Sequence, residues 1–285
     1  MPEFVGAVLT SLHNRFKLLH DNLVHIEGGL GSQILGAIIF WNLQDQLGKE
    51  KVRCDLSYFS RGAQSNDLWN YELGKFNIPI AEFKKFERNS KRNLLKAKRD
   101  FLTADELNDD FWQKARSRFL NNFNYDRNNT FAYFKEIAGL ETDEPFTAIH
   151  IRRGDYLKVA SKIITIDDYV NIVDVIENLV VGKIIVVSDS IVSDEDKSKL
   201  QSNLAKSELV FLDAPELDSF YTHCLLREAK LLVTANSTYS FSAGLLGRQG
   251  QTVFSPMQFH SGQGSEKYNS SFRAAGTFFA WPKRS

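Results

Sequence analysis

The stretch NLVHIEGGLGSQILGAIIFWNLQDQLGKEKVRCDL, residues 22–56, contains the pattern that decides the fold. Its first apolar run predicts a short strand at 22–27, and the glycine-rich string GGLGSQ predicts a turn. The apolar run that follows predicts a helix ending at Gly48, and a second strand is predicted at 51–56. Strand, turn, helix and strand in this order form a βαβ unit with parallel strands, so the sequence predicts the α/β class.

The same alternation resumes in the second half of the chain. Strands are predicted at 146–149, 183–189, 207–213 and 229–236, and helices at 166–180, 193–206, 216–228 and from 238 onwards. This alternation predicts a doubly wound, parallel sheet. Residues 81–129 predict polar helices, and LETDEP, residues 140–145, predicts a linker. We therefore expect two domains, 1–140 and 141–285.

The composition excludes several classes of protein. Hydrophobic residues make up 43% of the chain and charged residues 25%, which is typical of a soluble protein with a packed core. Lys plus Arg and Asp plus Glu number 35 each, so no overall charge attracts nucleic acid or an anionic membrane. A basic cluster at 84–99 is followed at once by acidic residues, which indicates a solvated helical face. Cys54 and Cys224 stand in apolar sequence and are expected to be buried and reduced, which favours the cytoplasm.

The opening MPEFVGAVLTSL is apolar but lacks the basic segment and the cleavage site of a signal peptide. No run approaches the roughly 18 to 20 apolar residues that cross a bilayer. We expect an amphipathic helix at 4–19 that lies on the body of the protein or, alternatively, on a membrane surface.

Polar residues follow four predicted strands of the second half. They stand in the strings HIRRGDY (150–156), SDS (188–190), LDAPELD (212–218) and TANSTYSFSAG (234–244). Ligands of open α/β sheets bind beyond the carboxyl ends of the strands. Arg152 and Arg153 are costly to hold there unless an anion meets them, and the guanidinium fork matches phosphate or carboxylate oxygens. The alternative is an Arg–Asp pair that only braces the turn after the strand.

The string at 234–244 predicts a second anion-binding feature. Asn236, Ser237, Thr238 and Ser240 stand where a strand opens into a helix, and exposed N–H groups at a helix start bind anions. Helix capping by Ser237 or Thr238 is the alternative, and it accounts for one hydroxyl. With the two arginines, this helix start predicts a diphosphate site that needs no metal. Asp194 and Asp196 fall in the first turn of a predicted helix, where acidic residues are common, so no metal site is expected.

The glycine loop of residues 28–33 also has to be compared with a dinucleotide-binding fingerprint. From Gly29 it has the pattern G-x-G-x-x-Ile34, so the third small residue is absent. Asp55 is the one acidic residue at the expected distance. A nicotinamide oxidoreductase is thus a weaker alternative, and we expect Gly29 and Gly31 to let a substrate approach the backbone.

The chain resembles glycosyltransferase family 11, the α-1,2-fucosyltransferases, in the order of its motifs. These motifs are GGLGSQ, then HIRRGDY, then ELDSFYTHC leading into TANSTYSFSAGLLG. The chain resembles more distantly the superfamily that includes α-1,6- and protein O-fucosyltransferases. The resemblance spans nearly the whole chain and implies a GT-B-like fold, in which two Rossmann-type domains face each other across a cleft. It further implies that residues 1–140 bind the acceptor and residues 141–285 bind GDP-fucose, without a cofactor or metal.

The resemblance also assigns site residues. It implies catalytic roles for the residues that match HxRRxD, namely His150, Arg152, Arg153 and Asp155, with Arg152 also contacting the donor. It implies donor-binding roles for Gly29, Gly31, Ser188, Asp189, Asp218, Asn236, Ser237, Thr238 and Ser240. Asp155 and Glu27 are both candidates for the base that takes the acceptor proton. The chain departs from the family at Ser32, where the family has an amide, and at Ser242, where it has an aromatic residue.

The implied reaction is inverting transfer of fucose from GDP-fucose to a hydroxyl of a glycan or glycolipid acceptor, with an α-1,2 linkage. The implied location is the cytoplasm, with peripheral contact at the inner membrane and a role in O-antigen biosynthesis. A non-catalytic module that binds a nucleotide or a glycan is the main alternative.

Overall fold

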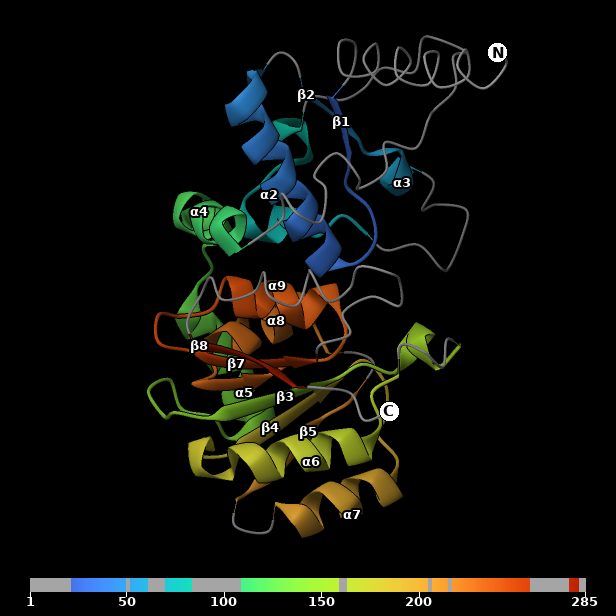
Figure 1. The fold of residues 1–285 in the computed structure, drawn as a ribbon, viewed down its shortest axis with the longest axis vertical. Helices are drawn as coiled ribbons and strands as arrows, with labels where there is room; N and C mark the ends of the chain where they lie inside the picture. Colours follow the sequence, from blue (N-terminus) through green and yellow to red (C-terminus); the bar gives the residue numbers. More distant parts are fainter. Residues whose placement is uncertain are drawn as a thin grey trace, which may run out of the picture. The chain divides into compact units, whose positions relative to one another are not determined.

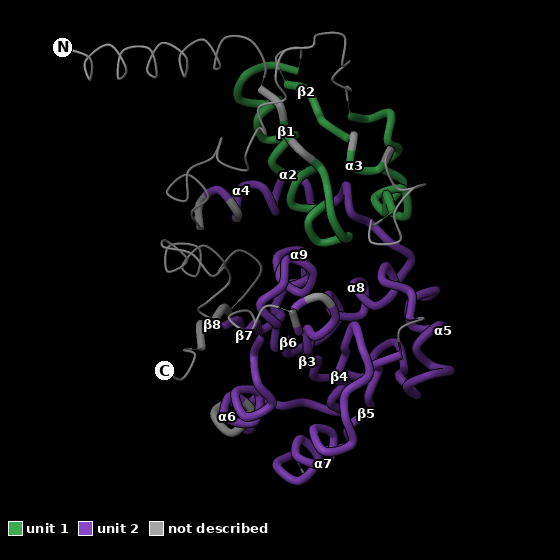
Figure 2. Tube along the Cα trace, turned by 90° about the vertical axis from the view of Figure 1, so that its right-hand side faces the viewer, with its two compact units in different colours: residues 1–102 green, residues 103–285 purple. Residues whose placement is uncertain are grey.

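The structure, a computed structural model, describes residues 22–49, 52–60, 70–83, 109–158, 163–204, 207–214, 217–256 and 277–281. The chain divides into two units, Met1–Leu102 and Thr103–Ser285 (Figure 2). The expected helix at 4–19 and the basic cluster at 84–99 lie outside the described residues. In the part of the chain that is described, no helix combines the length and the apolar character of a membrane span.

The first unit contains the expected βαβ element. Strands β1 (Asn22–His25) and β2 (Val52–Asp55) pair in parallel, and helix α2 (Leu30–Leu47) connects them. The helix begins inside the string that was predicted as a turn, because only Gly28, at φ 76°, has the left-handed backbone of a tight turn. The short helices α3 (Ser57–Ser60), η3 (Leu73–Phe76) and η4 (Ile80–Glu82) follow.

The second unit is a doubly wound α/β structure (Figure 1). Its first helices are α4 (Asp109–Phe119), η6 (Leu120–Phe123) and α5 (Arg127–Ala138). The alternating part contains β3 (Thr147–Ile151), η7 (Gly154–Lys158), α6 (Ile166–Ile176), η9 (Glu177–Leu179), β4 (Ile184–Ser188), α7 (Asp194–Asn203), β5 (Leu209–Leu212), α8 (Ser219–Glu228), β6 (Leu231–Val233), α9 (Thr238–Leu245), β7 (Thr252–Pro256) and β8 (Thr277–Trp281). The α/β class with parallel strands is therefore confirmed.

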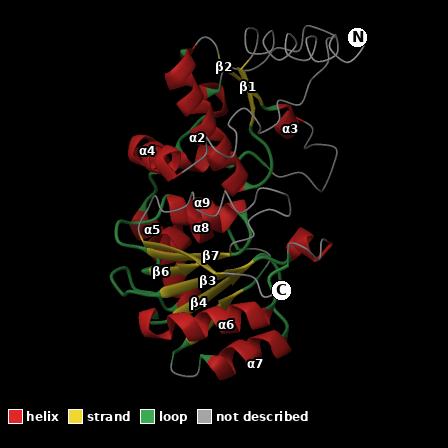
Figure 3. Ribbon diagram, viewed as in Figure 1, coloured by secondary structure: helices red, strands yellow, loops and turns green. Residues whose placement is uncertain are grey.

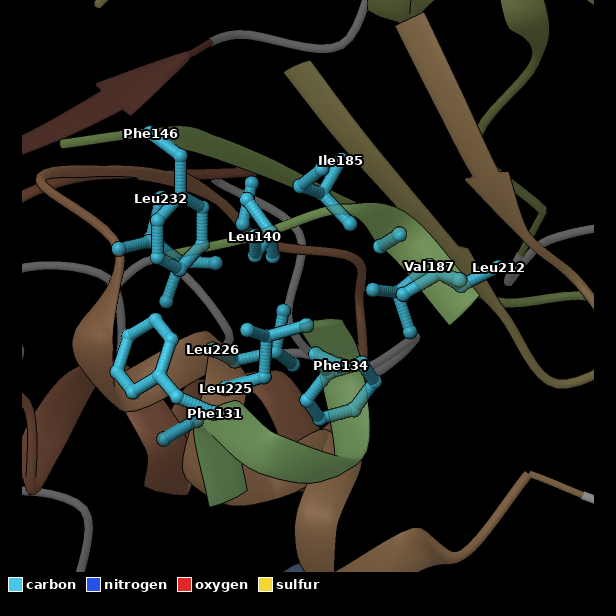
Figure 4. Packing of buried hydrophobic residues seen from close by; sticks show 14 of the residues in the cluster. Phe131, Phe134, Leu140, Phe146, Ile185, Val187, Leu212, Leu225, Leu226 and Leu232 are labelled. Atoms are coloured by element: carbon cyan, nitrogen blue, oxygen red, sulfur yellow. The ribbon is translucent and has the colours of Figure 1, made fainter. Parts of the chain in front are cut away.

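Helices cover both faces of this sheet. Helices α6 and α7 lie on one face, and α5, α8 and α9 lie on the other (Figures 1 and 3). Alternate residues of a strand point to opposite faces. Ile149 accordingly packs with Tyr169 of α6, whereas Ala148 packs with Phe134 of α5. Figure 4 shows the second of these cores, in which Phe131 and Phe134 of α5 point towards strand residues such as Ile185.

The boundary between the units differs from the one expected at residue 140. LETDEP is a turn within the second unit, and Leu140 is fully buried in its core. Two long-range contacts explain the difference. Arg116 of α4 donates to the carbonyl oxygens of Leu245 and Gly247, and Arg127 of α5 pairs with Glu228 of α8 at 2.9 Å. These contacts, with the aromatic face of α5, hold α4 and α5 against the sheet domain.

The strand order of the second unit is β5-β4-β3-β6-β7-β8. From β3 the chain adds β4 and β5 on one side, then crosses back and adds β6, β7 and β8 on the other. The order therefore reverses between β3 and β6. In doubly wound sheets this switch point opens a crevice beyond the carboxyl ends of the two strands, and nucleotides bind there.

Candidate functional site

The carboxyl ends of β4, β3 and β6 lie next to one another at the switch point. Ile151, the last residue of β3, pairs with Ser188, so Arg152 and Asp189 leave the sheet at the same level. On the other side, Val233 of β6 pairs with Ile149, so the segment leading to α9 leaves beside the end of β3. The fold thus brings HIRRGD, SDS and the start of α9 to one place.

The Arg152 side chain is held by groups of the chain itself. Its Nη1 atom lies 2.8 Å from Asp189 Oδ2, and its guanidinium lies 5.1 Å from the centre of the Tyr156 ring. Only 15% of the side chain is exposed. An Arg–Asp pair therefore braces this turn, but its acid is Asp189. The side chain of Asp155 lies outside what the structure describes.

Arg153 is held by its backbone and by one end of its side chain. Its N–H group donates to Asp189 Oδ1 at 2.7 Å, and its Nη1 atom donates to the Ile164 carbonyl oxygen at 2.8 Å. A guanidinium has five N–H donors, so the bond to Ile164 uses one of them. Arg153 is partly exposed, as is Arg152, so its guanidinium is a candidate to bind a ligand.

His150 is buried and contributes no charge to the site. Burial, with a smaller effect from Arg152, lowers its pKa to about 3, so the ring is neutral near pH 7. Among the described residues its Nδ1 atom has no hydrogen-bond partner. The ring packs against Tyr239 of α9 with 5.5 Å between centroids. His150 therefore links the end of β3 to the first turn of α9.

The four polar residues at the start of α9 have different surroundings. Ser237 is the N-cap and its hydroxyl accepts from Tyr239 N at 3.3 Å, while Ser240 Oγ accepts from Ala235 N at 3.2 Å and is fully buried. Two of the hydroxyls therefore have structural roles, in helix capping and in closing the turn, whereas capping alone was expected to account for one. Asn236 is buried, and its Oδ1 atom has no partner among the described residues. Thr238 is partly exposed.

Two other predicted donor-binding residues have local structural roles. Asp218 caps α8, because its carboxylate accepts from Phe220 N at 2.8 Å and from Tyr221 N at 3.2 Å. Ser188 is buried at the end of β4, where its hydroxyl accepts from Ser190 N at 3.4 Å. Both lie at strand or helix ends of the sheet domain, as expected, and their roles in binding stay predictions.

Gly29 and Gly31 belong to the other unit. Gly29 is the N-cap of α2, and Gly31 is buried in its first turn. The buried Gln33 fixes this turn, because its Nε2 atom donates to the carbonyl oxygens of Gly28 and Asn70 and its Oε1 atom accepts from Glu72 N. The loop is thus rigidly held, and its approach to a substrate stays a prediction.

The sequence did not indicate a second buried histidine near the site. His223 of α8 is fully buried, its Nε2 atom lies 2.9 Å from Ser242 Oγ, and its ring lies 5.3 Å from that of Tyr239. Burial lowers its pKa well below the usual value. Its position on the apolar face of α8 was the one available signal. Tyr239 consequently stands between two neutral histidines.

The acidic pair Asp194 and Asp196 lies in the first turn of helix α7, as expected. Ser193 is the N-cap of α7 and accepts from Asp196 N. Within the described ranges no three His, Cys, Asp or Glu side chains are grouped as metal ligands. Cys54 and Cys224 are both buried and form no disulfide bond, as expected.

No family model and no curated protein matches the chain. Three of the solved structures that resemble it are POFUT1 in complex with GDP, POFUT1 in complex with GDP-fucose, and the E. coli heptosyltransferase WaaC with ADP. The first is 13% identical, with 83% of this chain and 98% of that chain covered and a TM-score of 0.45. The second is 16% identical, with 51% and 50% covered and a TM-score of 0.37. The third is 9% identical, with 92% and 93% covered and a TM-score of 0.41. In the match to POFUT1 with GDP-fucose, the chain thus spans half the length of that protein's chain.

Proposed function

We propose that this protein is a glycosyltransferase whose donor is a nucleoside-diphosphate sugar, and that this donor is GDP-fucose. One observation carries the proposal: HIRRGD and the start of α9 flank the switch point of a doubly wound sheet and are linked by the His150–Tyr239 contact. The identity of the sugar rests on the resemblance of the three sequence motifs to family 11.

The chemistry of glycosyl transfer suits this arrangement. When the bond between the sugar and the diphosphate breaks, negative charge grows on the departing nucleotide. Fixed donors aimed at that charge lower the barrier, and the loss of one such donor typically costs about 2.7 to 4 kcal/mol. Arg153 and the N–H groups at the start of α9 are the proposed donors, with Arg152 beside them. The cationic charge of the two arginines is the basis for proposing a reaction that is independent of metal.

The acceptor is proposed to be a hydroxyl of a glycan or glycolipid, attacked with inversion to give an α-1,2 linkage. Asp155 and Glu27 are the candidates for the base that takes the proton. Glu27 is exposed beside the glycine turn of the first unit. Cytoplasmic location at the inner membrane face is part of the same proposal.

A thermal-shift titration of the full chain with GDP-fucose, GDP, ADP and NAD tests the donor, because a ligand stabilises the native state according to its affinity. GDP and GDP-fucose should raise the melting temperature most. Arg153→Ala and Arg153→Lys should both abolish the shift if the contact is bidentate. Arg248→Ala, in the turn that follows α9, is the matched control and should keep the shift. A larger shift with NAD would instead support the oxidoreductase.

Turnover is a separate measurement. Release of GDP from GDP-fucose in the presence of a panel of glycan acceptors should depend on Arg153. GDP binding without release for any acceptor would support the non-catalytic module. Asp155→Asn and Glu27→Gln, assayed beside the parent, distinguish the two candidate bases.

A further inference from the structure

We infer that Asp189 is a positioning residue of the proposed diphosphate site, and that it acts through the two arginines and does not touch the donor. The inference rests on the proposed function. Both carboxylate oxygens of Asp189 are used: Oδ2 lies 2.8 Å from Arg152 Nη1, and Oδ1 accepts from Arg153 N at 2.7 Å. One side chain at the end of β4 thus fixes a guanidinium and the next backbone N–H group at the end of β3.

This role replaces the expectation that Asp189 binds the donor. An ionised carboxylate only accepts hydrogen bonds, as does a diphosphate, so the two groups repel each other. Arg152 can satisfy both, because its guanidinium has five donors and Asp189 lies against one of its nitrogens. The acid therefore serves the anion site by holding the cation that faces it.

Gly154, the glycine of HIRRGD, is part of the same arrangement of Asp189 and the two arginines. A β-carbon on Gly154 would lie 2.3 Å from Asp189 Oδ2, and the residue has a φ of 25°. A side chain at this position would displace the carboxylate from both of its partners. The residues RRG after β3 and the acid after β4 therefore form one unit, although they are far apart in the sequence.

The pair is also shielded from water. The exposed fractions of the Arg152 and Asp189 side chains are 15% and 21%. Arg152 is consequently ordered before any ligand arrives. Binding to a preorganised group avoids the cost of ordering a long side chain in the complex. We expect the arrangement to contribute to both donor affinity and rate.

The variant Asp189→Asn distinguishes a positioning role of Asp189 from a role in neutralising charge. The amide keeps an acceptor for Arg153 N but loses the ion pair with Arg152, and the site becomes more positive. If Asp189 only neutralised charge, the variant would bind GDP more tightly. If it positions Arg152, the variant should bind GDP more weakly and turn over more slowly, each by about tenfold or more, because a misplacement of about 1 Å can cost 10²-fold in such sites.

Asp213→Asn is the matched control. Asp213 follows β5, lies 2.8 Å from Lys197 Nζ, and accepts from Val192 N at 2.8 Å. It repeats the chemistry of Asp189 two strands away from β3. This variant should keep GDP affinity and kcat within about twofold of the parent, since it touches no group at the switch point.

Three measurements on the full chain decide the matter: the Kd for GDP, the separate kcat and KM for GDP-fucose, and amide exchange of residues 150–158 without ligand. Asp189→Asn should weaken binding and lower kcat, and Asp189→Ala, which also removes the acceptor, should in addition speed exchange in this segment. Unchanged or tighter GDP binding by folded Asp189→Asn would overturn the inference and leave the proposed function standing. Absence of GDP binding by the parent would instead overturn the proposed function.

Discussion

His150 of β3 and Tyr239 of α9 pack ring against ring, with 5.5 Å between their centroids, in the interior of the sheet domain. The contact joins the two motifs that flank the switch point. It also buries an imidazole that stays neutral at ordinary pH, with Arg152 as a nearby cation and His223 as a second buried ring. The stability of the domain should therefore respond to acid in a defined way.

The pKa of His150 is about 3 in the folded protein and 6.5 in its ordinary state. Between these values the unfolded chain binds the proton and the folded chain does not, so stability falls as pH is lowered from 6.5 towards 3. Above pH 6.5 the contribution is fully present. Urea unfolding at a series of pH values should show a shallower loss for His150→Asn than for the parent. If the pH dependence of stability were the same for the parent and His150→Asn, His150 would not be buried in its neutral form.

Gly154→Ala tests the close approach to Asp189. We expect a loss of stability of about 1 kcal/mol, because alanine is strained at positive φ. We also expect weaker GDP binding, since the new β-carbon displaces the carboxylate. Gly139→Ala is the control: Gly139 has a φ of 58° at the end of α5, and among the described residues its β-carbon would meet only Lys183 Nζ, at 3.3 Å. Chemical denaturation and GDP titration should show a stability loss in both variants and a binding loss in Gly154→Ala alone.

The alternation of strands and helices was predictable because each element has a strong local pattern. Strands β3 and β4 are wholly buried and mostly apolar, as expected for a sheet covered on both faces. Strands β7 and β8 were not predicted. Each is a short apolar run, and unlike β3 and β4 neither is followed by a predicted helix, so the alternation of strands and helices did not indicate them.

The domain boundary and the details of the site depend on long-range contacts that a local pattern does not contain. LETDEP has the composition of a linker, but the pairing of Arg127 with Glu228 assigns α5 to the sheet domain. The polar strand ends were identified from the sequence. The pairing of Arg152 with Asp189 was not, because it depends on the register that sets Ile151 beside Ser188.

Glu228 should stabilise the second unit without affecting the site. Its carboxylate is 3% exposed and binds Arg127 Nε, Arg248 Nη1 and the Tyr125 hydroxyl. It ends α8, at the edge of the sheet opposite the carboxyl ends of the strands. Glu228→Gln should cost about 1 to 3 kcal/mol, because a buried charge-assisted network is broken. Asp143→Asn removes an exposed partner of Arg127 and should change little. Denaturant unfolding measures the change in stability of each variant, and GDP titration measures its binding. Weaker GDP binding by Glu228→Gln would contradict the prediction that Glu228 affects stability alone.

Gln33 should hold the first unit together at the glycine turn. It is fully buried, and the hydrogen bonds of its side-chain amide join Gly28 to the segment that contains Asn70 and Glu72. Gln33→Ala leaves up to three backbone groups unsatisfied, each worth about 1 to 3 kcal/mol if it stays buried. We therefore expect amide exchange and proteolysis to rise in residues 22–83 first. Gln46→Ala, on the exposed part of the same helix, should behave like the parent. Equal protection in all three proteins would show that the turn is held by its backbone alone.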